Sequence, residues 1–200
     1  MTEAEWLAGQ ARKMVTHTRS IATMRQRRLL ACGYCRLHWT DLPDDRLKQF
    51  VEQIEKYADG ESGSSLVRAY KLYDVVRLPA VRDALPPGLT PILKSAQSSN
   101  GDAPSASFPL WSDTDAQVEL IRDIFGNPFR SVPFSPSWRT DTVRALASQM
   151  YESRDFGAMP ILADALQDAG CDDEALLAHC RGPRPHVRGC WVVDLVLAKG

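Results

Sequence analysis

Cysteine and histidine residues with metal-ligand spacing are the first feature of this sequence that could carry chemistry. Two residues separate Cys32 from Cys35, and three separate His186 from Cys190. Both spacings suit chelation of one ion, and thiolate and imidazole are the usual ligands of Zn²⁺ in structural sites. One hypothesis is therefore a Cys3His zinc site in which these four residues join the two halves of the chain.

The same cysteines also fit a second interpretation, in which they are small core residues. Cys32 and Cys35 lie among leucines, where a free cysteine commonly packs as a hydrophobe. The second Cys-x2-Cys pair that many zinc sites have is missing. The five cysteines are an odd number, which favours reduced thiols over a disulfide framework. If the cysteines are core residues, the protein needs no cofactor. Zinc is the cofactor expected under the alternative interpretation.

Histidines and carboxylates near the carboxyl end form a candidate hydrolase centre. His179 and His186 could act as acid or base, and Asp164 could orient one of them. A hydrolase also needs a nucleophile or a metal placed against that base, and the spacing alone does not supply this geometry.

Structural ion pairs are the alternative role for the charged residues of this region. Asp164 and Asp194 each occur within an apolar helical run, and a buried carboxylate needs a cationic partner. Arg130, Arg181 and Arg188 are suitable partners because a guanidinium binds a carboxylate through two hydrogen bonds. We predict that these residues form structural pairs and that the chain has no catalytic residue.

A cluster of arginines near the amino end is a candidate nucleic-acid surface. Its members are Arg25, Arg27, Arg28 and Arg36, and an acidic segment follows at residues 41–59. Such a basic face could bind phosphates. The formal net charge of −1 argues against a general nucleic-acid binder, and two oppositely charged helix surfaces can simply attract each other.

Length and composition indicate a self-sufficient globular chain. Its 200 residues, of which 44% are hydrophobic, can bury a core without a metal or disulfides. The first residues lack the basic and apolar regions of a signal peptide, and no apolar run is long enough to span a bilayer. We expect a cytoplasmic protein with no membrane partner.

Hydrophobic periodicity predicts helices along most of the chain. The expected helices cover residues 20–39, 45–59, 64–77, 114–125, 141–151, 159–169, 172–181 and 190–197. The first of these should expose a basic side to solvent. A further short helix should start at the capping box Thr2-Glu-Ala-Glu5, and the β-branched segment 190–197 leaves a strand open as the alternative to a helix. Prolines and a Gln-Ser-Ser-Asn-Gly-Asp run at 85–113 predict a linker without a regular helix, in which Phe108 and Trp111, with the later Phe134, could dock a partner.

Several long motifs resemble a family of uncharacterised proteins that is expanded in planctomycete bacteria. The strongest are Leu120-Ile-Arg-Asp-Ile-Phe-Gly-Asn-Pro-Phe-Arg130 and His186-Val-Arg-Gly-Cys-Trp-Val-Val-Asp194, and the resemblance extends over nearly the whole chain. It implies a shared fold and supplies no mechanism.

The sequence therefore predicts an all-α bundle of about seven to nine helices in two packed layers. The first layer covers residues 1–85, a Pro/Ser-rich linker covers 86–113, and a carboxyl-terminal helical unit covers 114–200. The predicted role is a non-enzymatic interaction, scaffold or regulatory subunit with another protein as its partner. The alternatives are a nucleic-acid-binding subunit, with or without stabilising zinc, and a small hydrolase around His179, His186 and Asp164.

Overall fold

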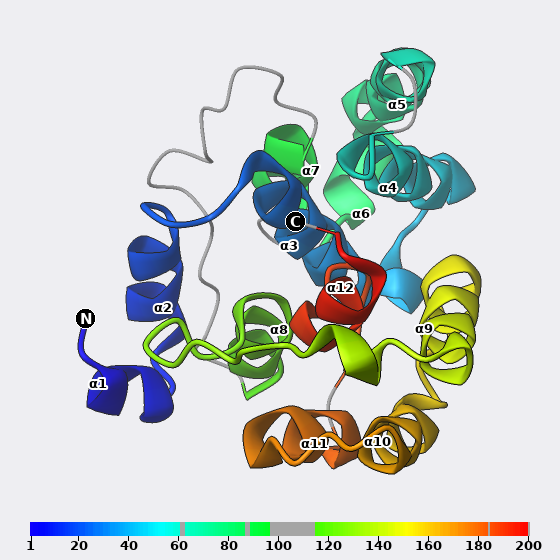
Figure 1. The fold of residues 1–200 in the computed structure, drawn as a ribbon. Helices are drawn as coiled ribbons and strands as arrows, with labels where there is room; N and C mark the ends of the chain where they lie inside the picture. Colours follow the sequence, from blue (N-terminus) through cyan, green and yellow to red (C-terminus); the bar gives the residue numbers. More distant parts are fainter. Residues whose placement is uncertain (61–62, 87–88, 97–114, 184, 200) are drawn as a thin grey trace.

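The computed structural model describes residues 1–60, 63–86, 89–96, 115–183 and 185–199. In these ranges the chain forms helices and no strand, which confirms the prediction of an all-α bundle (Figure 1). The α helices are α1 (Glu3–Leu7), α2 (Ala11–Thr18), α3 (Met24–Leu37), α4 (Asp45–Ala58), α5 (Gly63–Tyr73), α6 (Pro79–Ala84), α7 (Leu89–Ala96), α8 (Asp115–Phe125), α9 (Asp141–Ser153), α10 (Met159–Asp168), α11 (Glu174–Arg181) and α12 (Trp191–Leu197). Short 3-10 turns cover Trp39–Asp41, Asp74–Arg77 and Pro136–Trp138.

Side-chain caps explain where several helices begin. The hydroxyl of Thr2 accepts from the amide of Glu5, whose side chain bonds back to the Thr2 backbone, and Thr23 forms the same capping box with Gln26 at the start of α3. Thr140 and Asp173 cap α9 and α11. Each cap satisfies an amide that the first helical turn leaves without a partner.

Helix α3 is the central helix of the first half of the molecule, and this overturns the expectation of a basic solvent face (Figure 1). It packs against α4, α7 and α8, and no residue from 24 to 39 is exposed. The close approach of α8 depends on Gly33, because a Cβ there would lie 2.7 Å from a methyl group of Leu120. The arginines of α3 must therefore be neutralised inside the protein.

Helix α7 lies within the segment that was expected to be a linker without a regular helix, so that expectation is wrong for residues 89–96. Leu89, Ile92, Leu93 and Ala96 are all buried, and the helix packs along α3. A four-residue apolar stripe in a short helix is enough to bury one face when a neighbouring helix supplies the other side. The rest of the expected linker at 97–114, which includes Phe108 and Trp111, lies outside the described residues.

The buried side chains form two hydrophobic cores. The first contains side chains of α1 to α8 together with Val187, and the second contains side chains of α9 to α12. Helix α8, expected in the carboxyl-terminal unit, thus packs with the amino-terminal helices. Val187, in the segment between α11 and α12, inserts into the first core, so the two cores meet around that segment.

None of the described helices is both long and apolar enough to cross a membrane.

Candidate metal centre

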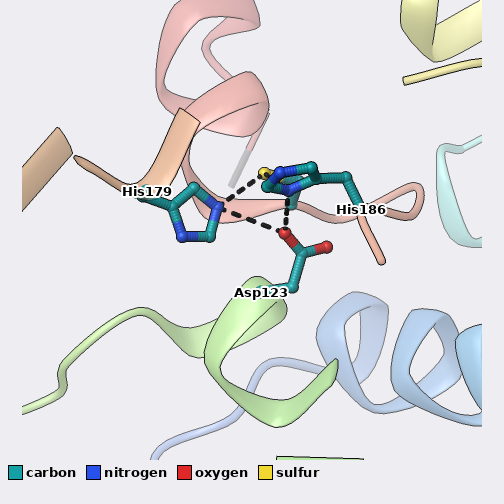
Figure 2. Close-up of side chains that lie close together, drawn as sticks. Asp123, His179 and His186 are labelled. Carbon is teal, nitrogen blue, oxygen red and sulfur yellow. Dashed lines mark hydrogen bonds and ion pairs between the residues drawn. The ribbon is translucent and has the colours of Figure 1, made fainter. Parts of the chain in front are cut away.

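Four side chains with metal-binding atoms converge where the two cores meet. They are Asp123 from α8, His179 from α11, His186 from the following segment and Cys190, the residue that precedes α12. Figure 2 shows Asp123, His179 and His186 pointing toward one another from these separate elements. One ligand atom from each of the four residues lies within 4.8 Å of the other three.

The distances describe a compact set of donor atoms. Oδ1 of Asp123 lies 2.7 Å from Nδ1 of His186 and 3.2 Å from Nε2 of His179. Sγ of Cys190 lies 3.2 Å from the same Nε2 of His179 and 3.8 Å from the same Nδ1 of His186. Each imidazole therefore faces both Asp123 and Cys190 with a single nitrogen.

This use of one nitrogen distinguishes the cluster from a catalytic relay. In a nucleophile–histidine–carboxylate relay, the imidazole lies between its partners and contacts them through opposite nitrogens. In the cluster, the two rings, the carboxylate and the thiol all aim at one common point. That arrangement suits coordination of an ion at the point, and it does not suit transfer of a proton from Cys190 through a histidine to Asp123.

Burial further limits what the cluster can do. The side chains of His179 and His186 are each 4% exposed, and Asp123 is fully buried. Burial alone would raise the pKa of Asp123, but hydrogen bonds with His179 and His186 outweigh it and lower this pKa. For Cys190, burial, together with the nearby charge of Asp123, raises the pKa well above its ordinary value. A thiol that keeps its proton is a poor nucleophile. A bound metal cation would favour the thiolate form.

Surrounding groups fix the orientation of the ligands. The second oxygen of Asp123 accepts a hydrogen bond of 2.9 Å from the backbone amide of Val187. On the far side of the His179 ring, Nδ1 lies 3.1 Å from the indole Nε1 of Trp191, which can only donate. Because Nδ1 accepts this hydrogen bond, the neutral imidazole of His179 carries its proton on Nε2, the nitrogen that faces Asp123 and Cys190. Nε2 of His186 is buried and has no hydrogen-bond partner among the described residues.

The predicted Cys3His set does not assemble. His186 and Cys190 do meet, but their companions are Asp123 and His179, and no candidate ligand group in the described residues contains Cys32 or Cys35. Those two thiols are buried in the first core, where Cys32 contacts the backbone oxygen of Val51. Helix α3 turns both side chains toward the core. Cys32 and Cys35 are therefore core thiols, as the second interpretation predicted.

The predicted hydrolase centre does not assemble around Asp164. This carboxylate is 72% exposed and pairs with Arg181 at 2.8 Å on the protein surface. The position of Asp164 on α10 therefore faces solvent, although its neighbours in sequence are apolar. The two histidines of the hypothesis do lie together, with Asp123 as the carboxylate between them.

The other residues predicted to form ion pairs do so with different partners. Arg130 pairs with Glu3, which ties the segment after α8 to α1. Asp194 pairs with Arg25, and Arg188 lies 3.5 Å from Asp59 and donates to the backbone oxygen of Tyr151.

The arginines predicted to form a nucleic-acid surface are held by internal contacts. Arg25 donates to Asp59, Asp194 and the hydroxyl of Tyr151, and its side chain is 12% exposed. Arg36 makes a bidentate pair with Glu55 and stacks on Trp39. Arg27 donates to the backbone oxygen of Arg19, and Arg28 lies over the ring of Tyr57. These contacts leave no continuous basic face on α3.

Asp123 is the member of the cluster that the sequence prediction missed. The signal was present, because a carboxylate stands between Ile121 and Ile124 on the apolar stripe of α8. A buried carboxylate on such a stripe needs a partner. Its partners come from residues 56 and 63 positions later, so the sequence could not name them.

The motifs that resemble the planctomycete family supply all four members of the cluster. Asp123 lies in the motif at 120–130, His179 in His179-Cys180-Arg181, and His186 and Cys190 in the motif at 186–194. The resemblance itself stays a prediction. Comparison of the chain with protein-family models, with curated proteins and with solved structures finds no match.

Proposed function

We propose that this protein is a zinc-dependent, non-enzymatic helical protein in which Asp123, His179, His186 and Cys190 hold one structural Zn²⁺ ion. The observation that carries the proposal is the convergence of four donor atoms, one from each residue, within 4.8 Å of one another. The donor set of two nitrogens, one oxygen and one sulfur matches the borderline-soft character of Zn²⁺.

The distances between the donor atoms fit a tetrahedral ion with a small adjustment. With zinc–ligand bonds of about 2.0–2.3 Å, ligand atoms lie roughly 3.3–3.7 Å apart. The contacts of 3.2, 3.2 and 3.8 Å are close to these values. The contact of 2.7 Å between Asp123 and His186 has hydrogen-bond length, so that pair must separate by about half an ångström when the ion displaces the shared proton.

A structural role follows from the closed coordination. Four protein ligands complete a tetrahedral zinc and leave no open position for a substrate, whereas catalytic zinc sites keep one. The ligands come from α8 in the first core and from the segment and helices that border the second. The ion would tie both cores together, and the folded helical surface would then be available to a protein partner.

Metal analysis of the purified chain tests this proposal. Protein prepared without chelators should contain about one zinc per chain, and Co²⁺ substitution should give the visible absorption of a tetrahedral site with one thiolate ligand. Removal of the ion with a strong chelator should lower the unfolding temperature. Zinc far below one equivalent, together with a Co²⁺ spectrum typical of octahedral coordination, would refute the proposal.

Two cysteine variants provide a matched comparison. Cys190→Ala should abolish the sulfur-to-cobalt charge-transfer band and lose zinc, because it removes a ligand. Cys32→Ala removes an equally buried thiol from the first core and should keep both. Loss of zinc from both variants would instead favour the set that the spacing suggested, which contains Cys32 as well as Cys190.

A further inference from the structure

A polar cleft lies at the carboxyl end of α12, lined also by residues of α9 and by Asp59, which follows α4. Its volume is about 620 Å³, and four cationic side chains line it: Arg139, Arg144, Arg188 and Lys199. Two carboxylates, Asp59 and Glu152, and the hydroxyl groups of Ser148 and Tyr151 complete its polar lining. The cleft therefore carries more positive than negative groups.

Asp59 cannot neutralise the cations around it, because too many share it. Its carboxylate accepts from Nε of Arg25 at 3.0 Å and lies 3.5 Å from Nη1 of Arg188 and 3.8 Å from Nζ of Lys199. The hydroxyl of Tyr151 donates to the same carboxylate at 2.6 Å. One negative charge thus serves three cations, and Arg25 also pairs with a second carboxylate, that of Asp194.

Arg139 and Arg144 add charge that has no acidic partner among the residues the structure describes. The guanidinium of Arg139 donates through Nε and Nη2 to the backbone oxygen of Leu195, near the carboxyl end of α12. These hydrogen bonds satisfy a carbonyl at the end of the helix, but they do not cancel the positive charge of the arginine. Arg144 lies one helical turn before Ser148 on α9, and both are exposed, so they present a guanidinium and a hydroxyl on one face.

Arg188 supplies an independent indication that the cleft has a ligand. Its side chain is 10% exposed, and its buried Nη1 forms no hydrogen bond within the described residues beyond the 3.5 Å ion pair with Asp59, a carboxylate that it shares with Arg25 and Lys199. A buried charged donor without a hydrogen bond is costly, and native structures rarely keep one. Arg188 lines the same cleft as Lys199 and Arg144.

We infer that this cleft binds a phosphate group, either as inorganic phosphate or as the end of a phosphomonoester. Guanidinium groups match the geometry of phosphate oxygens, and a phosphate near neutral pH carries close to two negative charges, which suits the excess of cations. The hydroxyl of Ser148 donates to the same group. This site is separate from the proposed zinc centre, shares no ligand residue with it and does not depend on zinc being bound there.

Calorimetric titration of the full chain with phosphate tests this inference. The titrations use inorganic phosphate and phenyl phosphate, at constant ionic strength set with chloride, on the wild type, Arg144→Gln and Arg68→Gln. Arg68 is an exposed arginine on α5 outside the cleft, so it controls for loss of one surface charge. Wild type and Arg68→Gln should bind saturably and equally, and Arg144→Gln should bind about tenfold more weakly.

The outcomes separate the two sources of phosphate and the inference itself. Binding of inorganic phosphate alone identifies free phosphate, and tighter binding of phenyl phosphate identifies a monoester. Absence of saturable binding of either probe up to about 10 mM, or equal weakening by Arg144→Gln and Arg68→Gln, would overturn the site. Lys199→Gln is a second variant, with the same weakening expected, and its side chain packs outside both cores.

Discussion

Oδ1 of Asp123 lies 2.7 Å from Nδ1 of His186, although 63 positions separate the two residues in the chain. The contact brings a helix of the first core against the segment that leads into the last helix. His179 and Cys190 complete the same cluster from either side of that segment.

Replacing Asp123 with asparagine should weaken zinc binding at least tenfold. The neutral amide keeps the shape of the side chain and can still accept from the Val187 amide, but it is a poor zinc ligand and carries no charge. Competition against a chromophoric chelator gives the affinity. Asp164→Asn removes a carboxylate from an exposed pair and is the matched control. Equal affinities of the two variants would argue against Asp123 as a ligand.

Replacing Trp191 with phenylalanine should strengthen zinc binding about two- to tenfold. The Trp191 indole donates to Nδ1 of His179, which holds the histidine proton on Nε2 and so stabilises the metal-free form. An ion on Nε2 moves that proton to Nδ1 and breaks the indole bond. The same chelator competition measures the change. A weaker affinity in this variant would mean that Trp191 supports the bound form instead.

Replacing Arg25 with glutamine should destabilise the fold by about 3–5 kcal/mol. The change leaves Asp59 and Asp194 without the cation that joins them, and burial already raises the pKa of Asp194 despite Arg25. Urea unfolding gives the free energy, with Arg68→Gln as the exposed control. A loss below about 1 kcal/mol, the range of surface pairs, would place Arg25 in solvent after all.

Replacing Leu93 with alanine should destabilise the fold by about 2–5 kcal/mol. Leu93 is fully buried in the first core, although it belongs to a segment that the sequence assigned to a linker. Lys94→Ala, at the next and exposed position, should change the unfolding free energy by less than about 0.5 kcal/mol. Similar small effects of both changes would restore the interpretation of this segment as a linker.

The protein should lose stability as the pH rises above about 8.5, where thiols of the unfolded chain begin to ionise. Burial and the charge of Glu55 raise the pKa of Cys35 to about 12 in the folded protein. The folded state thus keeps a proton that the unfolded state releases, so the contribution of Cys35 is complete below pH 8.5 and falls by about 1.4 kcal/mol per pH unit above it.

The comparison of the wild type with Cys35→Ala isolates this effect. Unfolding free energies measured from pH 7.5 to 10 should show the wild type losing its advantage over the variant as the pH rises. A constant difference between the two proteins would mean that the Cys35 thiol ionises equally in both states.

The sequence by itself determined the local structure. Capping residues such as Thr2 and Thr140, and apolar stripes such as that of α4, predict helices because both signals act within one or two turns. The pairing of His186 with Cys190 was also local, since the two residues lie one short turn apart. These features need no knowledge of what packs against them.

Tertiary structure alone decided the partners. Cys32 and Cys35 had zinc spacing, yet α3 is enclosed by α4, α7 and α8 and directs both thiols into the core. Arg25 was predicted on a solvent face and instead joins Asp59 to Asp194 across the molecule. Asp123 gained its histidines only because α8 packs in the first core beside the segment that holds Val187. Long-range packing sets which side chains meet, and a sequence pattern over a few turns does not encode it.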